Sequence, residues 1–322
     1  MNEFDVIRGI SGSLPDAPPE VLVPIGDDCA VLRLGGTTWE TTWETTWETT
    51  WAAAADMLVA GRHFKDWASP EDVGYKAVAV NVSDVAAMGA APRFVLVSGG
   101  APDPETAGRC FGGVREACEK FGVYPIGGDT TGAGSLTVDV SILGQFSHPP
   151  VLRSGARVGD LLAVTGELGA SSAGFLALEN ADRTLERLIR KHLRPEPRIA
   201  EGQAAARLEA HAMIDLSDGL ASDVRHICEK SGVGCRIELE QLPVADDTRA
   251  YLGSLGHVPE LIAATGGEDY ELLIAAPGAV IEALASETET PSTVIGEVTA
   301  GGAVFLRDGE NVEDLSGWDH FS

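Results

Sequence analysis

The chain has 322 residues, enough for two domains or one large domain, and its 44% hydrophobic content is ordinary for a globular protein. Its formal net charge of −26 argues against nucleic-acid binding, because nucleic-acid phosphates need Lys and Arg. The sequence has no apolar run of membrane-spanning length, and its start, MNEFDVIRGI, lacks the basic segment and apolar core of a signal peptide. We therefore expect a cytoplasmic protein with no membrane partner.

The cysteines and the acidic residues each limit the possible chemistry. The five cysteines are odd in number and form no CxxC pair, which favours reduced, packed thiols and no zinc site. Most of the 49 acidic residues must form a solvated acidic surface. A small number of them could still gather around divalent metal ions.

Short apolar runs predict the strands of the first half. These runs lie at residues 21–25, 29–34, 52–59, 93–98, 123–126 and 136–146. Residues 104–121 fit a helix that three internal glycines weaken. The sequence His-Pro-Pro at 148–150 is the best boundary, so we expect domains at 1–148 and 149–322.

Residues 37–51 repeat Thr-Thr-Trp-Glu and form a low-complexity tract. As a strand, the tract would place its tryptophans on one face and its glutamates on the other. Thr and Trp favour strands, and a period of four drifts on a helix, so we expect an extended or hairpin insertion. The tryptophan face could bind a partner, but a loop expansion without a role of its own is the simpler interpretation.

The segment 69–89 is predicted to form the helix on which the first domain is built. Ser69 fits the N-cap, Pro70 the first helical position, and Gly89 the residue after the helix. Apolar residues recur at helical spacing, so Asn81 and Asp84 fall on or beside an apolar face. A carboxylate there is costly unless a cation meets it, although an exposed aspartate on the helix flank is the alternative.

Strands and helices mix in the second half as well. Strands are predicted at residues 161–165, 213–214, 236–239 and 270–275 and near 294 and 304. Helices are predicted from residue 171, at 184–192, at 198–211, from 219 to about 230, and at 279–286. The class is therefore α/β or α+β with two domains.

A recurrent feature is an aspartate, often beside Gly or Ser, at the mouth of an apolar element. The instances are Asp27, Asp28, Asp56, Asp84, Asp129, Asp215 and Asp218. Such carboxylates would repel one another in a shared site unless cations neutralised them. Mg²⁺ prefers hard oxygen ligands and is often shared with substrate phosphates, so two or more Mg²⁺ ions with a nucleotide are the simplest occupants.

The common nucleotide and hydrolase fingerprints are missing. The sequence has no GxxxxGK[ST], no GxGxxG between a strand and a helix, no kinase HRD, no GxSxG and no HExxH. The triplet Gly127-Gly128-Asp129 is commonly a plain turn. Asp-Leu-Ser-Asp-Gly at 215–219 is stronger, because Ser217 and free backbone N–H groups at a helix start can hold phosphate, although ordinary N-capping is the alternative.

Several segments together resemble the thiamine-monophosphate kinases, which belong to the superfamily of aminoimidazole ribonucleotide synthetase and selenophosphate synthetase. They are IGDDCAVL (25–32), DMLVAGRHF (56–64), YKAVAVNVSDVAAMGA (75–90), IGGDTT (126–131), LRSGARVGD (152–160), IDLSDGL (214–220), GGEDYEL (266–272) and GWDHF (317–321). The match covers nearly the whole chain in order.

The resemblance implies a kinase that transfers the γ-phosphate of ATP to thiamine phosphate and forms thiamine diphosphate. It implies an α/β (α+β) architecture with two domains. The N-terminal domain would hold a mixed sheet and helices and would pair in a homodimer, and the C-terminal domain would be α/β. The active site would lie in the cleft between the domains.

The resemblance also assigns residues. The metal ligands would be Asp28, Asp56, Asp84, Asp129, Asp215 and Asp218. ATP would contact Gly128, Asp129, Arg153 and Ser217, and the catalytic residues would be Asp129, Arg153 and Asp218. Thiamine phosphate would meet His63, Glu268 and Trp318.

Ala54 and Ala55 depart from the family pattern, which usually has Ser or Thr before the aspartate matching Asp56. One metal site is then weakened, or completed by backbone oxygen and water. The expected chemistry is direct in-line attack on the γ-phosphorus, in which Mg²⁺ ions and Arg153 neutralise charge. The alternatives are another ATP-dependent enzyme of the superfamily or a catalytically silenced nucleotide-binding homologue.

Overall fold

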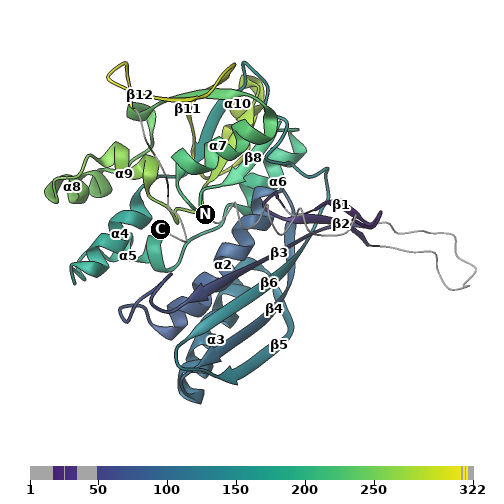
Figure 1. The fold of residues 1–322 in the computed structure, drawn as a ribbon, viewed down its shortest axis with the longest axis vertical. Helices are drawn as coiled ribbons and strands as arrows, with labels where there is room; N and C mark the ends of the chain where they lie inside the picture. Colours follow the sequence, from purple (N-terminus) through teal and green to yellow (C-terminus); the bar gives the residue numbers. More distant parts are fainter. Residues whose placement is uncertain (1–16, 25, 35–48, 313–314, 316, 318–322) are drawn as a thin grey trace, which may run out of the picture.

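The computed structural model describes residues 17–24, 26–34, 49–312, 315 and 317, which form two mixed sheets with helices (Figure 1). This two-domain α/β arrangement confirms the predicted fold class. One sheet spans residues 21–145 and the other spans 161–311, and the predicted boundary at 148/149 falls between them. Among the described helices, none is both long and apolar enough to cross a bilayer.

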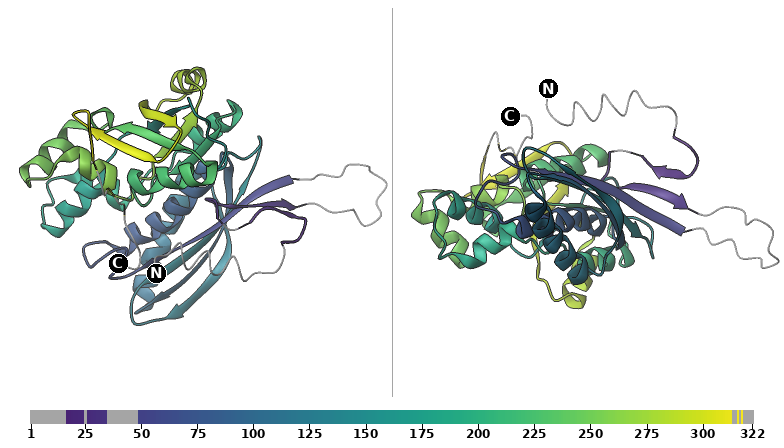
Figure 2. Two further views of the ribbon diagram at one scale, coloured as in Figure 1. Left: turned by 45° about the horizontal axis from the view of Figure 1, so that its top comes forward. Right: turned by 90° about the horizontal axis from the view of Figure 1, so that it is seen from below.

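The first sheet has six strands in the order β1-β2-β3-β6-β4-β5. They are β1 (Val21–Val23), β2 (Ala30–Leu34), β3 (Thr49–Val59), β4 (Ala91–Ala101), β5 (Tyr124–Gly132) and β6 (Thr137–Gln145). All neighbours are antiparallel except β4 and β5. Helices α2 (Pro70–Ala87) and α3 (Pro104–Phe121) lie against one face of this sheet (Figure 2), and the other face leaves Met57 and Leu96 about half exposed.

Helix α2 joins the two domains. The Ser69 side chain caps it by accepting a hydrogen bond from the Asp72 backbone N–H, and Gly89 follows it at φ 77°, as the sequence predicts. Most residues of α2 are buried, because β3 and β6 cover one side, α3 another, and α6 and β8 of the second domain a third. Polar side chains on α2 therefore have to find partners within the protein.

The second sheet has seven strands in the order β13-β12-β9-β11-β7-β10-β8. They are β7 (Leu161–Thr165), β8 (Ala212–Asp215), β9 (Gly234–Glu238), β10 (Leu272–Ala276), β11 (Ser292–Thr299), β12 (Ala303–Arg307) and β13 (Glu310–Asn311). Its central strands are apolar without alternation because helices cover both faces. Leu273 and Ala275 of β10 pack in the core that includes α7, whereas Ile274 packs in the core that includes α6 and α10.

The helices of the second domain surround this sheet. They are α4 (Ala170–Glu179), α5 (Glu186–Leu193), α6 (Ile199–Arg207), α7 (Leu220–Ser231), α8 (Asp246–Ser254), α9 (Pro259–Thr265) and α10 (Gly278–Glu287), with a 3₁₀ turn at Leu239–Gln241. Sequence analysis missed α8 and α9, which are only nine and seven residues long. It also placed the end of α6 too late, since the helix stops at Arg207.

One segment of the first sheet differs from its sequence-based prediction, and another lies mostly outside the described residues. Strand β5 continues through Gly127-Gly128-Asp129, so this triplet is extended backbone and not a turn. The tract 37–51 is described only for residues 49–51, which begin β3, and the rest lies outside the described residues. All five cysteines are buried and free of disulfides, as expected.

Candidate active site

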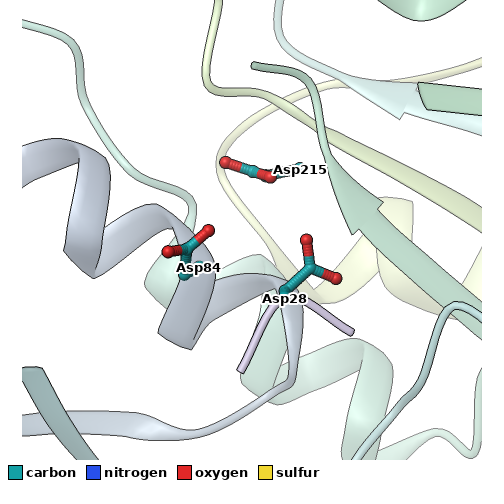
Figure 3. A group of neighbouring side chains, drawn as sticks. All are labelled: Asp28, Asp84 and Asp215. Atoms are coloured by element: carbon teal, nitrogen blue, oxygen red, sulfur yellow. The ribbon is translucent and has the colours of Figure 1, made fainter. Parts of the chain in front are cut away.

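Three aspartates from different parts of the chain meet between the two domains. Asp84 lies on α2, Asp215 ends β8, and Asp28 precedes β2 (Figure 3). One carboxylate oxygen of each lies within 4.8 Å of the other two. All three were predicted as metal ligands, and the tertiary structure brings them together from sequence positions up to 187 residues apart.

Burial and mutual repulsion make this cluster electrostatically unfavourable without a cation. Burial, and then the charges of Asp56, Asp215 and Asp28, raise the pKa of Asp84 well above its ordinary value. Burial and the charge of Asp28 raise the pKa of Asp215 to about 8. Hard carboxylate oxygens that share a buried space are a suitable donor set for Mg²⁺, so these residues fit a divalent metal ion.

Arg153 already neutralises one side of the cluster. Its guanidinium donates to both carboxylate oxygens of Asp28, with Nη2 at 2.8 Å from Oδ1 and Nε at 3.2 Å from Oδ2. Its backbone N–H donates to the Asp27 carboxylate, and burial with the neighbouring Asp28 charge raises the pKa of Asp27 to about 6. Arg153 therefore brings a positive side chain to the carboxylates, and its contact with phosphate stays a prediction.

Helix α2 also orients the aspartates through two uncharged residues that sequence analysis did not assign to the site. The Ser83 hydroxyl donates to Asp215 Oδ2 at 2.7 Å and so links the two domains. The Asn81 side-chain oxygen accepts the backbone N–H of Asp56 at 3.1 Å, while its Nδ2 donates to the Ala77 carbonyl. The sequence signal that could have identified them is their position on the same apolar helix, where Ser83 lies one residue and Asn81 three residues before Asp84.

Asp56 and Asp218 are not among the three clustered aspartates, but their charges act on neighbouring buried carboxylates. Burial is the largest cause that raises the pKa of Asp84, and the charge of Asp56 is the second. Asp218 lies three residues after Asp215. Burial, and then the charge of Asp218, raise the pKa of Asp223 well above its ordinary value. Sequence analysis missed Asp223, a buried carboxylate that accepts the Gly219 backbone N–H at 3.1 Å.

Gly128 and Asp129 lie on β5, away from the cluster. The row Asp56–Val140–Val97–Gly128 crosses three strand spacings, about 14 Å. Asp129 is the next residue along, so its side chain points to the opposite face of the sheet from Asp56. It is exposed there. Within one chain, therefore, the structure does not bring Asp129 to the carboxylates of Asp28, Asp84 and Asp215.

Backbone packing fixes β5 at the predicted nucleotide motif. A Cβ atom on Gly128 would lie 1.7 Å from the Val97 carbonyl oxygen, so only glycine fits this position. On β3, Ala54 and Ala55 pair with Ile142 and Ser141 and offer only methyl groups beside Asp56. Of the three neighbouring residues 54–56, only Asp56 carries a side-chain oxygen.

Ser217 lies in the loop after β8 and is held by a second loop. Its carbonyl oxygen accepts the Glu268 backbone N–H at 2.7 Å, and the Leu216 carbonyl accepts the Tyr270 N–H at 2.9 Å. The predicted nucleotide residue Ser217 and the predicted substrate residue Glu268 are therefore direct neighbours.

Two of the three predicted substrate residues, His63 and Glu268, are described by the structure, and they lie close to one group of side chains. His63 lines a small cavity with Trp67, Lys76 and His192. Glu268 contacts this group, because its Oε1 lies 2.9 Å from Lys76 Nζ and its Oε2 lies 3.3 Å from His192 Nδ1. Trp318 lies outside the described residues. The arrangement therefore provides an anionic site suited to a divalent metal ion and a second site with aromatic and charged side chains.

Comparison with known proteins identifies the class first. Residues 26–146 match the family model for the AIR synthase related protein, N-terminal domain, and residues 157–309 match the C-terminal domain of the same group. The two matches divide the chain where the two sheets divide it.

Full-length relatives then specify the group. The chain is 40% identical to thiamine-monophosphate kinase of Escherichia coli K12 (99% of this chain, 98% of the relative) and 38% identical to that of Mycobacterium tuberculosis H37Rv (100% and 92%). The structure of AaThiL complexed with AMPPCP and TMP is similar with a TM-score of 0.83 and 33% identity, over 99% of this chain and 97% of that one. The chain belongs to the thiamine-monophosphate kinase family.

Proposed function

We propose that this protein is an ATP-dependent kinase that transfers the γ-phosphate of ATP to thiamine phosphate and forms thiamine diphosphate. The observation that carries the proposal is the cluster of Asp28, Asp84 and Asp215 between the domains, in a chain related over its full length to kinases of this name. A relative of similar fold is described in complex with AMPPCP, an ATP analogue, and TMP, thiamine phosphate. The cytoplasmic location stays a prediction.

We assign the metal ligands to Asp28, Asp56, Asp84, Asp129, Asp215 and Asp218, for several Mg²⁺ ions whose number is open. Bound Mg²⁺ would neutralise phosphate charge and hold the two phosphorylated molecules in line. Ser83 would hold the Asp215 carboxylate in its ligating position, and Asn81 would fix the backbone at Asp56.

The nucleotide residues are Gly128, Asp129, Arg153 and Ser217, with Asp129, Arg153 and Asp218 as the catalytic group. The attacking phosphate of thiamine phosphate is already anionic, so the site needs charge neutralisation and not a strong general base. The Arg153 guanidinium, ion-paired to Asp28, is placed to redistribute its hydrogen bonds to phosphate oxygens.

The homodimer is part of the proposal. The outer face of the six-stranded sheet exposes Met57, Leu96 and Ile126 by 50%, 45% and 50%, which is unusual for side chains of this size grouped on one face. Asp129 lies on this same face. We propose that two chains pair through it, so that Asp129 acts as a metal ligand and nucleotide residue across the interface, toward the partner chain, and not at the cluster of its own chain.

The experiment is formation of thiamine diphosphate from ATP and thiamine phosphate by the purified chain, with ADP measured in parallel. We expect equal amounts of the two products, dependent on Mg²⁺. Asp84→Ala and Asp129→Ala should each abolish turnover, and near-normal turnover of either at limiting Mg²⁺ would contradict its assignment as a ligand. ADP without thiamine diphosphate would indicate another ATP-dependent reaction, and ATP binding without either product would indicate a silenced homologue.

A further inference from the structure

Lys76 is a buried cation that the metal and nucleotide sites do not use. It lies on α2 with 4% of its side chain exposed, among apolar neighbours such as Val73 and Val80. Its Nζ lies 2.9 Å from Glu268 Oε1, although no hydrogen bond of good orientation forms from Nζ within the described residues. An ammonium in this environment is costly without its anion, so Lys76 and Glu268 must be considered together.

Glu268 is held at an unusual backbone position. Its φ is +65°, which a non-glycine residue adopts rarely, and its N–H donates to the Ser217 carbonyl. Burial acts to raise the pKa of Glu268, but the neighbouring positive charge, chiefly that of Lys76, outweighs it and lowers the pKa. With 29% of its side chain exposed, Glu268 is the solvent-accessible member of the pair, and Lys76 is the buried member.

His192, on α5 of the same domain as Glu268, lies beside the second carboxylate oxygen. Burial and the Lys76 charge lower the pKa of His192 to about 3, so the ring is neutral. Its Nδ1 lies 3.3 Å from Glu268 Oε2 and 3.1 Å from Ser171 Oγ. The hydrogen bond of Nδ1 is with Ser171, and the Glu268 carboxylate is the second polar group near this nitrogen.

Two aromatic rings lie against His192, the residue that neighbours this carboxylate. The Trp67 and Phe175 ring centroids each lie 5.6 Å from the His192 ring, and the two lie 6.2 Å from each other. The carboxylate and the aromatic rings therefore border the same histidine, which is a suitable environment for a flat, positively charged ring. Thiamine phosphate carries such a ring, the thiazolium.

We propose that Lys76 and His192 are positioning residues that hold the Glu268 carboxylate at the cleft, where it accepts the positive charge of the thiazolium ring. The inference rests on the proposed function and adds the group that Glu268 recognises and the two residues that orient it. Lys76 precedes Asp84 by eight residues on α2, about 12 Å along the helix. One rigid helix therefore sets the distance between the ring subsite and the phosphate subsite.

The test measures KM and kcat for Lys76→Met and Glu268→Gln. We expect KM for thiamine phosphate to rise roughly 10- to 100-fold in each variant, the loss of one charged contact, while KM for ATP stays within about twofold. Lys76→Arg should restore part of the affinity. Lys120→Met, which removes an exposed ion pair with Glu196, is the matched control and should leave both KM values unchanged.

A binding measurement without ATP separates charge recognition from a loss of structure. Deazathiamine phosphate, in which a neutral thiophene replaces the thiazolium, should bind wild type more weakly than thiamine phosphate. Glu268→Gln should remove most of that preference, and thermal unfolding should show that the variant is folded. Equal preference in wild type and Glu268→Gln would overturn the proposal, as would a wild-type KM for thiamine phosphate in a folded Lys76→Met.

Failure of the proposed function and failure of the positioning role of Lys76 would give different experimental results. If wild type forms no thiamine diphosphate, the proposed function is wrong, and the positioning role falls with it. If wild type turns over normally but Lys76→Met alters KM for ATP and thiamine phosphate equally, the proposed function stands and the role of Lys76 in ring recognition is wrong.

Discussion

Replacing Asp84 by Asn should stabilise the metal-free protein, although it removes a residue of the active site. Asp84 contributes a carboxylate to a cluster whose oxygens lie within 4.8 Å of one another. Asn is nearly the same shape and carries no charge. The substitution therefore removes repulsion with Asp28 and Asp215 and leaves the packing of α2 largely unchanged.

The magnitude follows from the geometry. Two unit charges 4.8 Å apart repel by about 3.5 kcal/mol at an effective dielectric constant of 20. Asp84 can avoid this repulsion by taking up a proton. Keeping its carboxyl protonated costs about 1.4 kcal/mol for each pH unit above its ordinary pKa of 3.8, and this limits the total electrostatic cost. At neutral pH this gives an upper bound of about 4 kcal/mol, and we expect about 1–3 kcal/mol after relaxation.

Thermal unfolding with and without MgCl₂ tests this reasoning. Without metal, the variant should melt several degrees above wild type, since about 1 kcal/mol shifts the melting temperature by about 2–4 °C in domains of this size. With excess Mg²⁺, wild type should gain stability and the variant should gain little. Asp246→Asn, at an exposed acid on α8, is the control. A destabilised metal-free variant, or an equal Mg²⁺ response, would refute the reasoning.

Three other substitutions follow from the same structure. Metal-free protein should lose stability as pH rises from about 4 to about 8, because the folded state keeps the Asp215 proton (pKa about 8) that the unfolded chain releases near 3.8; Asp215→Asn should flatten this loss in thermal scans. Ser83→Ala should raise the Mg²⁺ concentration needed for half-maximal thermal stabilisation by about tenfold, and an unchanged value would exclude a role in holding Asp215. Gly128→Ala should destabilise by roughly 2–4 kcal/mol in denaturant unfolding, whereas Gly132→Ala on the same strand, with open space around it, should cost under about 1 kcal/mol; similar values would contradict the packing argument.

Local signals predicted much of the fold. The helix at α2 begins at Ser69 and is followed by Gly89, as its capping residues indicate. The apolar run at β7 appears at its expected place. Helices α8 and α9 escaped because one or two turns carry too little periodicity to stand out from a loop. Strand β5 was ended too early because its glycines normally signal turns, whereas here they allow close contact with β4.

Some residues of the candidate site could be predicted from the sequence, and others could not. The sequence marked Asp28, Asp84 and Asp215 as costly carboxylates at the mouths of apolar elements, and the structure places them together. It gave no reason to select Lys76 or His192, because a lysine in an apolar helix and a histidine in a basic one are each ordinary residues until their neighbours are known.

The amino-acid sequence by itself determined the local elements, the aspartate pattern and the family, because capping, periodicity and motif order are properties of neighbouring residues. Only the tertiary structure decided which charges meet. It brought Glu268 between Lys76 and His192, and it turned Asp129 to the outer face of its sheet. Electrostatic energies depend on distance and burial, and packing between two domains sets both.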